Sequence, residues 1–125
     1  MPLRLLIAGY FSVQATAGAL WWGMMWLWPA SRSWFWPTDT SNSVLLAFAT
    51  ADLVCFVGGS ALAAFMVARH HAWARAVLWL VTGMVSYAAL FVLASLIATG
   101  EAPLAAALMV AAAAGTWLAT TCYRV

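Results

Sequence analysis

The sequence predicts an all-α membrane protein, a bundle of four transmembrane helices. Of its 125 residues, 67% are hydrophobic and only 6% are charged. A soluble globular domain carries roughly a quarter charged residues and at most about half apolar ones. The formal net charge of +2 is also too small for a nucleic-acid-binding surface. The composition therefore excludes soluble enzymes, disordered tails and nucleic-acid partners.

The length of the chain allows four crossings of a membrane. A crossing helix needs about 20 residues, which rise about 1.5 Å each, and the connections between helices can be short. Four continuous apolar stretches satisfy this requirement, and we predict that they form one domain over residues 1–125. The predicted spans are residues 5–28, 44–68, 74–98 and 102–123.

The first span begins like a secretion signal, because Arg4 precedes an apolar run. The run continues to Trp28, and no small-x-small cleavage site follows a short apolar core. We therefore expect this segment to remain in the mature protein as a transmembrane helix. The sequence leaves open whether the chain is a complete small protein or one module of a longer one.

Helix-breaking and helix-capping residues separate the predicted spans. Pro29 and Pro37 end the first span, and the polar run 38–43 supplies several N-cap candidates for the second. Gly100 closes the third span, while Glu101 and Pro103 suit the first turn of the fourth. This third connection is short, so the last two helices should be antiparallel neighbours.

The arginines predict the orientation, since Lys and Arg in short loops stay cytoplasmic. Arg32 falls on one side of a four-span arrangement, and the other four arginines fall on the opposite side: Arg4, Arg69, Arg75 and Arg124. We therefore expect both termini and the loop 69–73 to be cytoplasmic, in a multi-pass protein of the inner (plasma) membrane. Arg69 and Arg75 should bind anionic lipid headgroups, at about 1 kcal/mol per arginine.

Six of the nine tryptophans, together with one phenylalanine, cluster near the end of the first span and in the loop after it. Such residues commonly form an aromatic belt at the membrane–water interface. Aromatic side chains also dominate binding hot spots, so a docking surface for a partner subunit, a lipid or a flat pigment is the alternative. The cluster comprises Trp21, Trp22, Trp26, Trp28, Trp34, Phe35 and Trp36.

Asp52 is the one acidic residue inside a predicted span. It lies four residues from Phe56, the midpoint of the second span, or about 6 Å along a helix. An aspartate near the bilayer centre costs about 2.5 to 3.5 kcal/mol on insertion scales. Asp52 should therefore face the bundle interior, be paired with another group, or be protonated.

Depth along the helices predicts which polar residues meet inside the bundle. Tyr87 in the third span lies within about 4 to 5 Å of the level of Asp52, so we expect these two to be partners. Gln14 and Thr116 fall at a second common level and should form another polar layer. Interhelical hydrogen bonds of about 1 kcal/mol each would explain all four residues. The alternatives are a proton- or substrate-linked carboxyl at Asp52 and a contact with a neighbouring protein.

Other chemistry is weakly indicated, and the sequence names no cofactor. His70 and His71 are adjacent, so on a helix they point about 100° apart and cannot bind one metal together. Cys55 and Cys122 lie at different predicted depths, which argues against a disulfide. Alanines and glycines line parts of the second and fourth spans and favour close helix packing.

Two family resemblances are visible. In size and in number of spans the chain is similar to small multidrug transporters, which carry a glutamate in the first span. Here the first span has Gln14, and the acid is Asp52 in the second span. Residues 45–60 and 79–95 resemble hydrophobic modules that precede membrane methyltransferase domains, but no catalytic or cofactor motif follows them.

These observations favour a non-catalytic accessory or scaffold subunit of a larger membrane complex, in contact with membrane lipids and with other subunits or copies of itself. The aromatic cluster and the small-residue helix surfaces support this hypothesis. The alternative is a small homo-oligomeric, proton-coupled transporter that uses Asp52. An enzyme acting on lipid is a third hypothesis, with less support.

Overall fold

The computed structural model describes residues 3–123, and the prediction of an all-α protein with four helices long and apolar enough to cross a membrane is confirmed. Helix α1 comprises Leu3–Leu27 and α5 comprises Ala74–Thr99, while α6 comprises Pro103–Cys122. The second long helix, Asn42–Ala68, consists of three consecutive elements: α3 (Asn42–Asp52), η2 (Leu53–Gly58) and α4 (Gly59–Ala68). The chain is therefore a multi-pass membrane protein, and its long helices overlap the four predicted spans.

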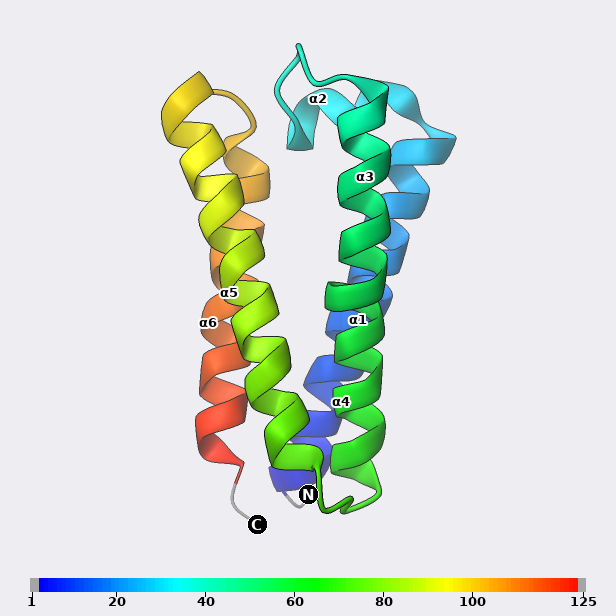
Figure 1. Cartoon of the computed structure of the whole chain (residues 1–125), viewed down its shortest axis with the longest axis vertical. Coiled ribbons are helices and arrows are strands. Elements are labelled where there is room, and N and C mark those ends of the chain that lie inside the picture. The colour runs from blue at the N-terminus through cyan, green and yellow to red at the C-terminus, as the bar shows by residue number, and fades with distance from the viewer. Residues whose placement is uncertain (1–2, 124–125) are drawn as a thin grey trace.

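The four long helices run alongside one another (Figure 1). Helix α1 packs most extensively against α4, and α5 against α6. One end of the bundle, the termini end, contains the start of α1, the end of α6 and the turn between α4 and α5. The other end, the cap end, contains residues 28–41 and the α5–α6 hairpin. Helix α5 contacts α4 and η2, whereas it diverges from α3 toward the cap end (Figure 1).

Part of the cap-end segment that we expected to be a loop is helical. A 3-10 turn, η1 (Pro29–Ser31), leads into a short helix, α2 (Arg32–Phe35). Arg32 ties this segment to α1, because its Nε donates to the carbonyl of Met25 at 3.0 Å. Basic side chains commonly satisfy the last carbonyls of a helix in this way. Ser41 then caps α3 by accepting from the amide of Val44, as the polar run 38–43 predicts.

The α5–α6 hairpin turns within three residues. Gly100 ends α5 in the left-handed region, with φ 70°, and Ala102 also has a positive φ of 57°. A non-glycine residue rarely adopts this conformation, so the tight turn imposes some strain at Ala102. Pro103 begins α6, where a proline loses no helical hydrogen bond. The hairpin makes α5 and α6 the antiparallel neighbours that the sequence predicts.

The π-helix η2 interrupts the second long helix immediately after Asp52. A π-helical turn accommodates extra residues and changes the direction of the side chains that follow it, and such turns are frequent at functional sites. The apolar pattern of the segment contains no signal for it, since every residue of η2 also suits an ordinary helix. The π-helix lies at the level where η2 packs against both α1 and α5.

Candidate functional site

Asp52, at the end of α3, is hydrogen-bonded to a tryptophan of α1. The indole Nε1 of Trp22 donates to Oδ2 of Asp52 at 2.7 Å. Trp22 is buried, and Asp52 is half-buried. The carboxyl of Asp52 therefore has a hydrogen-bond partner and faces the bundle. Both features lower the energetic cost of a carboxyl group inside a membrane.

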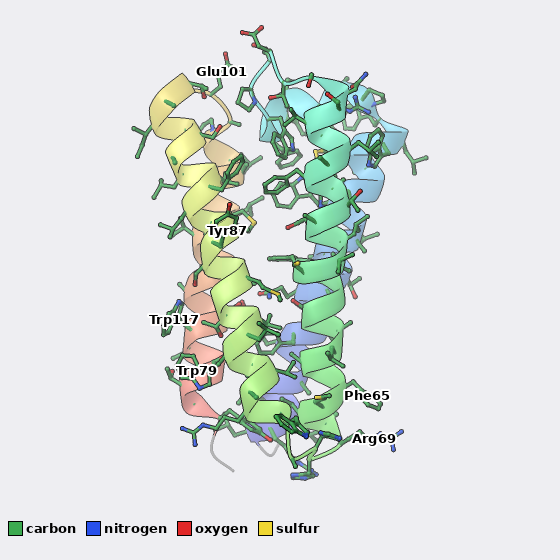
Figure 2. The ribbon with its side chains drawn as sticks, viewed as in Figure 1. Phe65, Arg69, Trp79, Tyr87, Glu101 and Trp117 are labelled. Carbon is green, nitrogen blue, oxygen red and sulfur yellow. The ribbon has the colours of Figure 1, made fainter. Side chains whose placement is uncertain are left out.

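The expectation that Tyr87 is the partner of Asp52 is wrong. The side chain of Tyr87 is 72% exposed and, within residues 3–123, makes no hydrogen bond. Tyr87 and Asp52 do line the same open groove between α3 and α5, and Figure 2 shows Tyr87 on α5 toward this gap. The two residues thus share a groove, but depth along a helix carries no information about the direction in which each side chain points.

A small, partly open cavity lies between the two helix pairs on the cap side of Asp52. We call it the aromatic cavity, and it has a volume of about 20 Å³. Aromatic rings fill the space where α5 diverges from α3: the ring centroids of Phe48 lie 5.1 Å from Trp36 and 5.0 Å from Phe91. Trp21, Trp22 and Asp52 also line the cavity.

The seven aromatic residues of the predicted cluster divide into two groups. Trp26, Trp28 and Trp34 are exposed at the cap end, as an interfacial belt or an external docking surface requires. Trp22, Phe35 and Trp36 are buried in the cap-end core, and Trp21 is half-buried. Trp22 and Trp36 are therefore part of the internal packing, whereas Trp21 and Phe35 also line an open groove between α1 and α6.

The polar layer predicted from Gln14 and Thr116 is present in the structure, and it is larger than expected. The Oε1 atom of Gln14 lies 3.0 Å from the hydroxyl of Thr116 and accepts from the hydroxyl of Tyr10 at 2.7 Å. Its Nε2 donates to Ser60 at 3.0 Å. Gln14 thus connects α1 with α4 and α6. Sequence reasoning missed Tyr10 and Ser60, although the four-residue step from Tyr10 to Gln14 is a helical-neighbour spacing that signals the first of them.

The basic residues divide between the two ends of the bundle. Arg69 follows α4 at the termini end, where its guanidinium lies 5.4 Å from the ring centroid of Phe65 (Figure 2). Arg75 is exposed in the first turn of α5. Arg32, at the cap end, lies 4.9 Å from the ring of Trp26. Arg124, which we assigned to the cytoplasmic side, lies outside the described residues.

Two open grooves flank the aromatic cavity. The α1–α6 groove has a volume of about 840 Å³ and is lined by apolar and small residues, among them Gly23, Leu108 and Ala111. The α3–α5 groove has a volume of about 520 Å³ and includes Asp52 and Tyr87. Within residues 3–123, no group of three His, Cys, Asp or Glu side chains lies close enough to hold a metal ion.

Comparison of the chain with protein families, with curated proteins and with solved structures gives no match in any of the three.

Proposed function

We propose that this protein is a non-catalytic accessory subunit of a larger complex in the inner (plasma) membrane, with both termini in the cytoplasm. The observation that carries the proposal is the α1–α6 groove, an open apolar depression of about 840 Å³ beside the polar layer. The occupant we propose is a transmembrane helix of another membrane protein. The small side chains of Gly23 and Ala111 would let its backbone approach closely, which is how helices associate in lipid.

The internal hydrogen bonds support the same proposal. Asp52 and Gln14 are polar residues inside the predicted spans, and each forms a hydrogen bond between two helices. Asp52 joins α3 to α1, and Gln14 joins α1 to α4. Their geometry accounts for them as interhelical contacts, each worth about 1 kcal/mol. The orientation rests on the arginine distribution, with Arg69 and Arg75 at the termini end and Arg32 at the cap end.

Photocrosslinking in native membranes tests the proposed partner helix. A photoreactive residue would replace Leu108, which lines the groove, or Leu90, which is exposed on α5 away from the grooves described above. We expect a crosslinked protein of one discrete mass from position 108 and none from position 90. Crosslinks to lipid alone, or to a second copy of this chain, would contradict the proposal.

A pair of glycine substitutions then shows whether the groove itself is responsible. A Cβ at Gly23 or at Gly9 would have no atom within 4 Å, so a side chain at either position starts into open space. Gly23→Leu places a side chain in the α1–α6 groove. Gly9→Leu instead places one in a separate depression between α1 and α4. We expect Gly23→Leu to abolish the crosslink and Gly9→Leu to retain it. Equal crosslinking in both variants would exclude this groove as the docking site.

A transporter that uses Asp52 is the second candidate, because Asp52 lines both the aromatic cavity and the open α3–α5 groove. A carboxyl between two such spaces has the placement that a proton-linked site requires. Asp52→Asn preserves the shape of the side chain and an oxygen that can accept from Trp22. Proton-coupled uptake by proteoliposomes that Asp52→Asn abolishes would favour transport over the accessory role.

A further inference from the structure

The depression between α1 and α4 is an open groove that begins near the termini end. We call it the α1–α4 groove, and its volume is about 460 Å³. Gly9, Ser12 and Thr16 of α1 line it and are exposed, so the groove faces the lipid. On α1 it extends from residue 8 to residue 16, about 12 Å at 1.5 Å per residue. One leaflet supplies half of a hydrocarbon core that is about 30 Å thick, so the groove follows most of the depth of one leaflet.

The lining of this groove suits a hydrocarbon chain. Its two hydroxyl groups are already used, because Ser12 donates to the carbonyl of Ala8 at 2.9 Å and Thr16 donates to the carbonyl of Ser12 at 2.9 Å. Hydroxyls that bond to the preceding turn of their own helix leave no donor for a neighbour. The other lining residues are glycine, alanines and Phe65. These small side chains let an acyl chain contact both helices over a wide area.

An arginine lies at the termini end of the groove. Arg69 directly follows the lining residue Ala68, and its guanidinium lies 5.4 Å from the ring centroid of Phe65, which also lines the groove. Figure 2 shows the side chains of Phe65 and Arg69 at the end of α4. On α1, Arg4 precedes the lining residue Ala8 by one helical turn, and residues at this spacing share a helix face. The groove therefore ends among basic side chains, where the two apolar helices begin and end.

The acidic residues of the chain lie away from this end. Of the three, Asp39 and Glu101 lie at the cap end, and Asp52 lies within the second long helix. Within residues 3–123, the hydrogen bonds donated by arginines are those of Arg32 at the cap end. Basic pockets between transmembrane helices bind anionic lipid headgroups. The α1–α6 groove, by contrast, has no charged residue in its described lining, so charge favours an anionic lipid in the α1–α4 groove.

We propose that the α1–α4 groove is a binding site for one anionic phospholipid, whose acyl chain lies along the groove and whose phosphate lies beside Arg69. The bound lipid covers the small residues that the bundle leaves exposed between α1 and α4. The site goes beyond the proposed accessory role and does not depend on it. The partner helix is proposed for the α1–α6 groove, which shares no lining residue with this one.

Native mass spectrometry with added lipid tests the headgroup preference. The purified protein in detergent micelles is given dioleoylphosphatidylglycerol, which is anionic, or dioleoylphosphatidylcholine, which is zwitterionic and has the same acyl chains. We expect one phosphatidylglycerol to bind per chain, more tightly than phosphatidylcholine. Equal binding of the two lipids would overturn the proposal.

Two arginine substitutions distinguish a defined site from general attraction to a basic surface. Arg69→Gln and Arg75→Gln remove the same charge from the same end, but Arg75 belongs to α5, which contributes no residue to the groove lining. We expect Arg69→Gln to weaken phosphatidylglycerol binding about fivefold, the effect of one arginine near an anionic surface. Arg75→Gln should leave the binding nearly unchanged. Equal losses in the two variants would mean that no defined site exists.

Two glycine substitutions test the place of the acyl chain. Gly9 lines the α1–α4 groove and Gly23 lines the α1–α6 groove, and a Cβ at either position would have no atom within 4 Å. We expect Gly9→Leu to abolish phosphatidylglycerol binding and Gly23→Leu to retain it. The partner crosslink should respond in the opposite way, so failure of the lipid site and failure of the accessory role give different results. Wild-type lipid affinity in a folded Gly9→Leu protein would contradict the proposal. Should Gly9→Leu fail to fold, the two arginine variants still decide it.

Discussion

The indole of Trp22 and the carboxyl of Asp52 form a 2.7 Å hydrogen bond across 30 residues of sequence. It joins α1 to the end of α3, directly before the π-helix η2. The bond gives the membrane-embedded acid a partner and explains why Trp22 lies inside the bundle, away from the lipid interface. It also fixes one wall of the aromatic cavity.

Removal of the indole donor should destabilise the bundle. Trp22→Phe retains an aromatic ring but leaves Oδ2 of Asp52 without its hydrogen bond, and an unpaired buried polar group costs about 1 to 3 kcal/mol. We expect a loss of about 1 kcal/mol or more in the free energy of unfolding, measured by denaturant titration in mixed micelles. Trp26→Phe is the matched control on the same helix, because Trp26 is exposed. Equal losses in the two variants would show that the hydrogen bond is not responsible.

The polar layer should depend on Gln14. Gln14→Leu removes the acceptor of Tyr10 and the donor to Ser60, so we expect a loss of about 1 to 2 kcal/mol at roughly 1 kcal/mol per interhelical hydrogen bond. Thr16→Ala is the control, since the hydroxyl of Thr16 bonds only to a backbone carbonyl of its own helix. Unfolding in mixed micelles measures both variants. A double-mutant cycle with Ser60→Ala should give a positive coupling energy, and strict additivity would contradict a direct bond.

Two glycines of α1 should respond differently to the same substitution. A Cβ on Gly18 would lie 2.9 Å from Cγ2 of Val57 and 3.0 Å from the ring of Phe56, whereas a Cβ on Gly23 would contact nothing. Overpacking of this kind costs about 1 to 3 kcal/mol. We therefore expect Gly18→Ala to lower the thermal midpoint of unfolding in detergent and Gly23→Ala to leave it within error. A neutral Gly18→Ala would mean that α1 and η2 are not in close contact.

The cap should loosen when its link to the α5–α6 hairpin is removed. The amide of Thr38 donates to Oε2 of Glu101 at 2.6 Å, and the hydroxyl of Thr38 lies 3.3 Å from Oε1. We expect Glu101→Ala to accelerate hydrogen exchange at the amide of Thr38 and around it, while the amides of the long helices remain protected. Asp39→Ala, at the neighbouring exposed acid, is the control. Unchanged exchange at Thr38 in Glu101→Ala would contradict this role of Glu101.

Composition and length were enough to predict an all-α chain with four apolar helices, because each segment is long, apolar and bounded by recognisable breaks such as Pro29 and Gly100. Depth arithmetic also brought Gln14 and Thr116 together. Both inferences depend only on position along a helix, which the sequence specifies directly.

The pairing of Asp52 with Trp22 depends on how the helices are rotated about their axes. Small side chains occur on several faces, so the hydrophobic pattern does not define this rotation. For the same reason the sequence did not reveal the π-helix after Asp52.

The accessory role is tested most directly by native mass spectrometry of the wild-type protein, extracted mildly from its own membrane with its companions retained. The account predicts a complex of fixed stoichiometry with a different membrane protein, lost in Gly23→Leu and kept in Gly9→Leu. A chain that is found only alone, or only with copies of itself, would contradict the accessory role.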